Sequence, residues 1–200
     1  MTSGRRGVWA ATVAAGAIAV VAGARAALRH QAAVARRRIG KPLGEQAPDA
    51  DRVWRPALAG EPVDLLLLGD SIAAGLGAER RKDTLGARLA KAAAHGIHRP
   101  VRLRTGATVG AESTALPSQL GALPADYRPA AAVIVVGGND VTHRIPVPVS
   151  VEHLARAVTE LRARGAVVVV GTCPDLGALR PVPQPLRALA SRLSRQLAAA

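Results

Sequence analysis

Short apolar runs, each followed by small or polar residues, constrain the fold of this 200-residue chain more than any other feature. They suggest strands at residues 63–68 (VDLLLL), 101–104 (VRLR), 131–136 (AAVIVV) and 166–170 (AVVVV). Between and after them, amphipathic patterns predict helices at residues 85–95, about 150–164 and from 185 onward. Largely apolar strands that alternate with helices predict an α/β fold with a parallel sheet covered on both faces.

The residues that follow these strands are candidates for a functional site, because ligands bind at the carboxyl ends of strands in such sheets. Gly69-Asp70-Ser71 ends the first run, Gly110 lies in a loop of small residues after the second, and Asn139-Asp140 follows the third. Each also has an ordinary structural interpretation. Ser71 could cap a helix, Gly110 could serve loop flexibility, and Asn139 could cap a helix or occupy a turn.

Several well-defined sites are excluded by their missing motifs. The chain has no Gly-x-Ser-x-Gly elbow, no Gly-x-Gly-x-x-Gly and no Gly-Lys-Ser/Thr. A serine hydrolase, however, needs hydrogen-bond donors aimed at a developing oxyanion, and glycine lets a backbone N–H approach it closely. Gly110 and the Asn139 amide fit that need. We expect no cofactor and no metal, since the single cysteine, Cys173, excludes a multi-cysteine site.

The segments LLLLGDSIAAGLG, VRLRTGATVGAES and AAVIVVGGNDVTH, in this order and spacing, resemble blocks I, II and III of the SGNH (GDSL-type) hydrolase family. The resemblance implies a three-layer α/β/α sandwich of flavodoxin-like type. It implies Ser71 as the nucleophile, with Gly110 and Asn139 completing an oxyanion hole beside the Ser71 N–H. Asp70 and Asp140 would brace the loops. The implied activity is hydrolysis of carboxylic esters, with a lipid ester, an acylated glycan or a small acyl ester as substrate.

The chain departs from the family at block V, an Asp-x-x-His that supplies the general base and the acid that orients it. No such motif follows Gly171, so we expect a domain that is incomplete at its C-terminus and weakly active or inactive by itself. Asp140 and His143 spell Asp-x-x-His, but they follow the third strand and not the last. We interpret His143 as a loop histidine at the mouth of the site. Cys173 has no neighbouring His or Lys to activate its thiol.

The N-terminus suggests a membrane anchor. An uncharged run covers residues 7–24, long enough to span a bilayer although rich in alanine and glycine. The alternatives are a signal peptide cleaved near Ala22-Gly23-Ala24, which would give a secreted or cell-envelope protein, and a plain helix. The predicted organisation is an anchor at 1–30, a basic linker at 31–61 and the hydrolase-type domain at 62–200.

Charge adds little to the functional hypothesis. The net charge is +13, of which +6 falls within residues 1–50, and the rest is scattered without a basic helix face. Aromatic residues make up only 2%, which argues against stacking on single-stranded nucleic acid. We therefore expect no nucleic-acid partner. Two other hypotheses stay open: a membrane-tethered binding domain without catalysis, and a membrane-surface module within residues 1–41.

Overall fold

The computed structural model describes residues 3–39 and 46–200. The chain forms two compact units. The first, which we call the helical unit, comprises Met1–Gly40 and Gly177–Leu189. The second, the α/β unit, comprises Lys41–Leu176 and Ala190–Ala200 and contains every strand that the structure describes.

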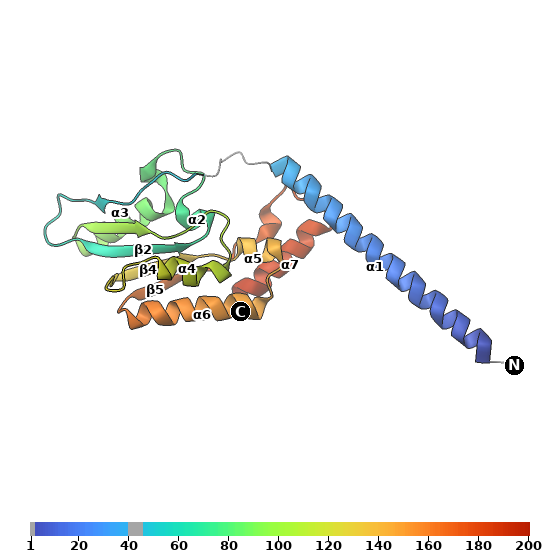
Figure 1. The fold of residues 1–200 in the computed structure, drawn as a ribbon. Helices are drawn as coiled ribbons and strands as arrows, with labels where there is room; N and C mark the ends of the chain where they lie inside the picture. Colours follow the sequence, from blue (N-terminus) through green and yellow to red (C-terminus); the bar gives the residue numbers. More distant parts are fainter. Residues whose placement is uncertain (1–2, 40–45) are drawn as a thin grey trace. The chain divides into compact units, whose positions relative to one another are not determined.

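The α/β unit is built on a five-stranded sheet with the spatial order β1-β3-β2-β4-β5 (Figure 1). The strands are β1 (Val53–Trp54), β2 (Val63–Gly69), β3 (Val101–Thr105), β4 (Ala131–Val135) and β5 (Val167–Gly171). All neighbours pair in parallel except β1, a short antiparallel edge strand beside β3. The chain leaves β2 toward β3 on one side and later returns to β4 on the other. This is the flavodoxin-like order, in which ligands bind where the winding direction reverses.

Helices cover both faces of this sheet. The helices of the α/β unit are α2 (Ser71–Ala74), α3 (Leu85–Ile97), α4 (Leu116–Gly121), α5 (Gly138–His143), α6 (Val147–Ala163) and the part of α7 (Leu186–Ala199) that follows Leu189. Alternate leucines of β2 serve the two faces, as expected for a strand buried on both sides. Leu65 and Leu67 join the core under α3, whereas Leu66 and Leu68 join the core under α4 and α6. The predicted three-layer α/β/α sandwich is confirmed.

The element boundaries differ from the prediction in a few places. Helix α3 does not end at residue 95 but continues through Ile97 to a left-handed cap at His98. Thr84 is the N-cap of that helix and accepts a hydrogen bond from the Ala87 N–H at 3.2 Å. Helix α6 begins at Val147, after Pro146, so Ser150 lies inside the helix and is free for another task.

Strand β5 is more exposed than its sequence predicts. Four consecutive valines indicated a strand buried on both faces, yet Val167 is 68% exposed and Val169 is 54% exposed. Val167 and Val169 lie on the same face of the sheet as Ala131 and Val133, which pack against the core under α3. None of the described residues of that core comes from β5, the strand at the edge of the sheet, so this face of β5 is left open.

The helical unit contains α1 (Ser3–Ile39) and residues 177–189. The side-chain amide of Gln31 joins the two segments. Its Nε2 donates to the Gln184 carbonyl oxygen at 2.8 Å, and its Oε1 accepts from the Leu186 N–H at 3.1 Å. The helical part of the predicted linker thus belongs to α1, whereas residues 40–45 of that linker lie outside the described residues.

The prediction of a single membrane-spanning N-terminal helix is wrong. Within residues 3–39 and 46–200, no helix is both long enough and apolar enough to cross a bilayer. Helix α1 has 37 residues, so what it lacks is hydrophobicity. Its uncharged run consists mainly of alanine and glycine, which contribute little apolar surface.

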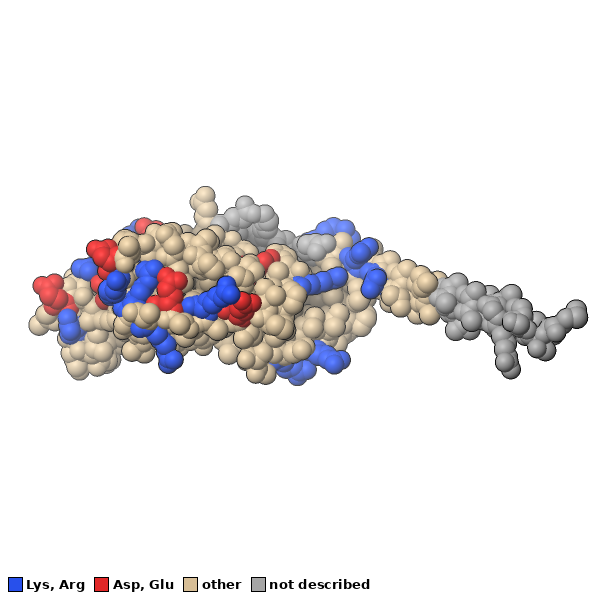
Figure 2. Space-filling view, turned by 60° about the horizontal axis from the view of Figure 1, so that its bottom comes forward, with Lys and Arg blue, Asp and Glu red and all other residues tan. Residues whose placement is uncertain are grey.

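Charged side chains are interspersed on the face of the α/β unit shown in Figure 2. Several arginines lie beside carboxylates, in the ion pairs Arg80–Asp83, Arg102–Asp64, Arg156–Glu152 and Arg164–Glu160. Part of the arginine excess is therefore balanced locally.

Candidate active site

The turn that carries Ser71 follows β2 directly and is fixed by its backbone. Gly69 has a φ of +126°, and a Cβ at this position would lie 1.9 Å from the Val135 carbonyl oxygen. Only glycine allows β2 and β4 to approach this closely. The Gln119 side chain then bonds both backbone groups of Gly69, accepting from its N–H at 2.9 Å and donating to its carbonyl oxygen at 2.8 Å.

Asp70, and not Ser71, caps the short helix that follows. The Asp70 carboxylate accepts a hydrogen bond from the Ile72 N–H at 2.9 Å, and the side chain is only 4% exposed. Burial raises the pKa of Asp70 above its usual value, the Ile72 hydrogen bond opposes this rise, and the charge of Asp140 adds to it. Ser71 is thereby left half-buried at the start of α2, with its hydroxyl free of capping duty.

The loop after β3 brings Gly110 to the same edge of the sheet. Beyond the end of β3, the Gly106 N–H donates to the Leu67 carbonyl oxygen at 2.8 Å and the Thr108 N–H donates to that of Gly69 at 3.0 Å. The loop therefore continues alongside β2 as far as the Ser71 turn. Gly110 then adopts a φ of +83° in an exposed turn.

Helix α5 carries Asn139 and Asp140 and begins immediately after β4. Its N-cap is Gly137, whose φ is +129°, so Asn139 is neither a cap nor a turn residue. The Asn139 Nδ2 donates to the Ala111 carbonyl oxygen at 2.8 Å. One hydrogen of the amide thus binds the residue next to Gly110, and the other is left for a further acceptor.

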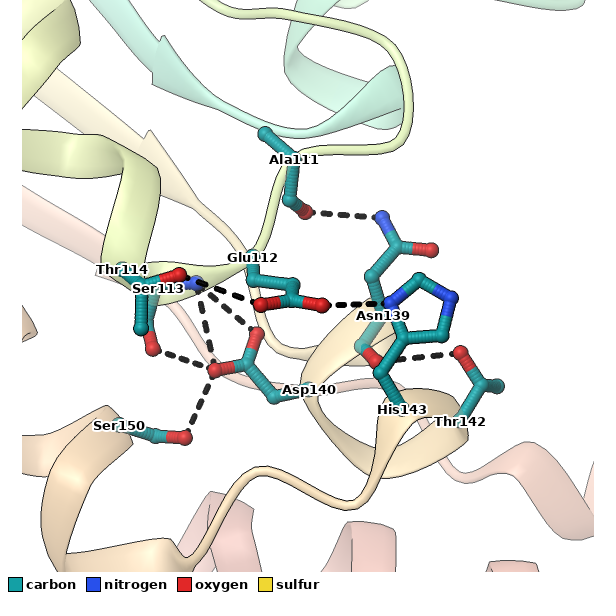
Figure 3. Close-up of polar contacts among 9 residues, drawn as sticks. All are labelled: Ala111, Glu112, Ser113, Thr114, Asn139, Asp140, Thr142, His143 and Ser150. Atoms are coloured by element: carbon teal, nitrogen blue, oxygen red, sulfur yellow. Dashed lines mark hydrogen bonds and ion pairs between the residues drawn. The ribbon is translucent and has the colours of Figure 1, made fainter.

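Asp140 ties α5 to two other elements (Figure 3). Its carboxylate is fully buried and accepts from the Ser113 N–H, the Ser113 hydroxyl and, at 2.7 Å, the Ser150 hydroxyl. The sequence did not predict these partners, since Ser113 lies in a loop of small residues and Ser150 lies at the predicted start of a helix. The Ser113 N–H, the Ser113 hydroxyl and the Ser150 hydroxyl all donate to the Asp140 carboxylate.

Three donors at this edge have capacity left over. No described residue accepts a hydrogen bond from the N–H of Ser71 or Gly110, and the Asn139 amide keeps one hydrogen. The Ser71 hydroxyl likewise has no hydrogen-bond partner among the described residues. The edge thus combines a hydroxyl with donors suited to a negatively charged oxygen.

The histidines occupy other environments. His143 Nδ1 lies 2.6 Å from the Glu112 carboxylate. His95 and His98 contact each other at the end of α3, and the Nδ1 of His153 on α6 is buried without a partner. Within residues 3–39 and 46–200, no group of three or more His, Cys, Asp or Glu side chains is arranged to hold a metal ion.

Cys173 is an unreactive thiol at neutral pH. It is buried after β5, and burial raises the pKa of its thiol to about 11, with the charges of Asp140, Asp70 and Asp175 adding to the rise. A thiol with this pKa is almost entirely protonated near pH 7, so it is a poor nucleophile.

A cavity of about 470 Å³ lies beside the start of α5. Its wall includes Gly137 and Asp140, which flank Asn139 in the sequence. The rest is mainly apolar and comes from β4, β5, α6 and the end of α7, including Val136, Leu154, Val158, Val170 and Leu197.

Comparison with known proteins points to one family. Residues 67–200 match the GDSL-like Lipase/Acylhydrolase family. The chain is 41% identical over 189 residues to the GDSL-like esterase Rv1075c of Mycobacterium tuberculosis, an alignment that covers 89% of this chain. It spans 60% of the length of that relative.

Solved structures share the fold. AlinE4, an SGNH-hydrolase family esterase, matches with a TM-score of 0.52 at 23% identity, over 70% of each chain. A G-D-S-L family protein from Desulfitobacterium hafniense matches with a TM-score of 0.51 at 13% identity, over 68% of this chain and 70% of the other.

Proposed function

The chain belongs to the GDSL-like lipase/acylhydrolase family, and from this premise we propose that it is a serine ester hydrolase with Ser71 as its nucleophile. The observation that carries the proposal is the convergence of Ser71, Gly110 and Asn139 on one sheet edge, through the Thr108–Gly69 and Asn139–Ala111 hydrogen bonds. The Ser71 hydroxyl would attack the ester carbonyl carbon. The alcohol would then leave, and water would release the acyl group from Ser71.

The oxyanion would be held by three donors. We assign these to the N–H groups of Ser71 and Gly110 and to the second amide hydrogen of Asn139. Their support is that none of the three is bonded to a described residue. Loss of one such donor typically lowers kcat by about 10²–10³-fold. Asp70 and Asp140 would hold the two turns in place.

Attack by Ser71 also needs a proton acceptor. No described side chain is hydrogen-bonded to the Ser71 hydroxyl. The family resemblance assigns this task to a histidine of an Asp-x-x-His motif. We therefore propose to assay the chain both by itself and continued by any downstream coding sequence that encodes such a motif.

The substrate class we favour is an ester with an apolar acyl chain. Its support is the mainly apolar cavity beside the start of α5, which Gly137 and Asp140 line and which Ser71, Gly110 and Asn139 do not. A series of p-nitrophenyl esters from acetate to octanoate tests this. A kcat/KM that rises with chain length supports it, and a preference for acetate contradicts it.

The nucleophile is tested with a fluorophosphonate probe, followed by mass mapping of the labelled peptide. We expect the label on Ser71, and we expect Ser71→Ala to lose both labelling and ester hydrolysis. The matched control is Ser118→Ala, because Ser118 is an exposed serine on α4 whose hydroxyl bonds only the Ala115 carbonyl oxygen. Hydrolysis that survives Ser71→Ala would contradict the proposal.

The alternative is a domain that binds acyl esters without cleaving them. The Ser71 hydroxyl has no hydrogen-bond partner among the described residues, so no proton acceptor for it is identified. This observation favours the alternative. Binding of an ester by a chain that stays inert in both forms of the assay, with Ser71 unlabelled, would support this alternative.

A further inference from the structure

A carboxylate–imidazole pair lies beside Asn139 and is not used by the proposed chemistry. His143 Nδ1 is 2.6 Å from Glu112 Oε1, and the other carboxylate oxygen accepts from the Thr114 hydroxyl at 3.2 Å. Figure 3 shows the Glu112 carboxylate between these two partners. The pair therefore holds the loop that follows Gly110 against the last turn of α5.

This pair completes a set of three successive ties. Ala111 bonds Asn139, Glu112 bonds His143, and Ser113 bonds Asp140. Asn139 and His143 are four residues apart, so both lie on one face of α5. Every residue of the loop segment that follows Gly110 is thus attached to the helix that carries the Asn139 amide.

Gly110 itself has little else to fix its place. It is exposed, and a Cβ built on it would meet no atom within 4 Å. Its position must therefore come from the residues on either side. On one side Thr108 is bonded to Gly69 at the end of β2 and accepts a hydrogen bond from the Ala111 N–H at 3.1 Å, which closes the turn around Gly110. On the other side are the three ties to α5.

We propose that Glu112 and His143 are positioning residues that set the Gly110 N–H relative to the Asn139 amide in the oxyanion hole. This inference rests on the proposed ester hydrolysis. The imidazole side chain is 56% exposed and the glutamate side chain is 25% exposed, so the pair contributes little to global stability. A small displacement of a catalytic donor, by contrast, costs much in rate.

The test compares His143→Ala with His143→Asn in ester hydrolysis. Asparagine places an N–H donor close to the position of Nδ1, so it retains the bond to Glu112. We expect His143→Ala to lower kcat about tenfold, a part of what a whole oxyanion donor supplies, with KM and the urea midpoint unchanged. His143→Asn restores kcat to within about twofold of the wild type. Glu112→Ala matches His143→Ala, and the double variant loses no more than either single variant.

The control is His95→Ala, an exposed histidine at the far end of α3, which leaves kcat unchanged. Unchanged kcat in His143→Ala overturns the inference. So does a loss that His143→Asn fails to restore, because the imidazole would then act through its own proton chemistry.

Amide hydrogen exchange at Ala111 and Ser113 separates this inference from the proposed function, because both N–H groups are hydrogen-bonded in the loop that the pair holds. Faster exchange in His143→Ala, reversed in His143→Asn, supports the positioning role whether or not turnover is observed. Equal exchange in all three proteins overturns it. Absence of both hydrolysis and Ser71 labelling in the wild type counts against the proposed function.

Discussion

The two turns that carry the candidate site begin alike. Each follows one of two neighbouring parallel strands, β2 or β4, and each opens with a glycine of nearly equal φ, +126° at Gly69 and +129° at Gly137. Each also buries an aspartate, Asp70 in the first turn and Asp140 in the second.

The turns differ in what holds them. The Ser71 turn is fixed by main-chain contact, since a Cβ on Gly69 would meet the Val135 carbonyl oxygen, and Asp70 accepts a single N–H. The Asn139 turn is fixed by side chains: Asp140 takes three donors, and a Cβ on Gly137 would first meet the Cys173 side chain, 3.0 Å away. The proposed nucleophile Ser71 and the proposed oxyanion donor Asn139 can therefore share one sheet edge and yet respond to different substitutions.

Gly69→Ala should have the largest effect. The new methyl group would collide with backbone that is part of the β2–β4 pairing and cannot move without breaking it. We expect a loss of about 4 kcal/mol or more in the free energy of unfolding, measured by urea denaturation. The control is Gly96→Ala, inside α3 with no atom near the new methyl, which should stabilise by about 0.5–1 kcal/mol.

Asp140→Ala comes next. It leaves the Ser113 N–H and two hydroxyls buried without their acceptor, and we expect a loss of about 3 kcal/mol in the same measurement. Ser150→Ala removes only one of the donors and should cost about 1 kcal/mol. Equal losses in the two variants would show that the network does not act through Asp140.

Gly137→Ala sharpens the contrast with Gly69. The φ of Gly137 is as unfavourable for alanine as that of Gly69, but its nearest neighbours are the side chains of Cys173 and Leu197. We expect a loss of about 2 kcal/mol, mostly from backbone strain. A loss as large as that of Gly69→Ala would mean that strain, and not backbone collision, dominates in both turns.

The sequence was sufficient for the four parallel strands and for the order of the site segments, but the short antiparallel strand β1 lies in the segment that was predicted to be a linker. Apolar runs such as LLLL and VIVV indicate strands that are buried on both faces, and that information is local. The same runs do not predict which strands lie side by side in the sheet. For this reason β5 was expected to be buried, although it lies at the edge of the sheet.

The network around the site could not be predicted from one sequence. Gln119, Ser113 and Ser150 meet Gly69 and Asp140 across separations of 50, 27 and 10 residues, with no motif to connect them. The uncharged N-terminal run led to a wrong prediction of a membrane-spanning helix for a different reason, since the information needed was present in the sequence. Its length was readable, but its alanine and glycine content decides against a membrane span.

Asp70→Asn should have the smallest effect on the free energy of unfolding. It tests the Ser71 turn, which is held mainly by main-chain contact. Asparagine can still accept the Ile72 N–H, so we expect a change within about 1 kcal/mol at neutral pH. The effect should depend on pH in a definite direction. Burial raises the pKa of Asp70 in the folded state above its usual value of 3.8, so the unfolded chain releases this proton first as pH rises. The wild type therefore loses stability from about pH 3.8 upward through the raised pKa, and the variant does not.

The difference between the two proteins should vanish below that window and favour Asp70→Asn above it, in urea midpoints measured as a function of pH. Asp83→Asn is a control of opposite sign, because the hydrogen bond from Arg80 lowers the pKa of Asp83. That variant should be the less stable protein above the usual pKa and should match the wild type in acid. If Asp70→Asn were instead as harmful at neutral pH as Asp140→Ala, the Ser71 turn would depend on its carboxylate as much as the Asn139 turn does. The contrast between main-chain and side-chain control would then be wrong.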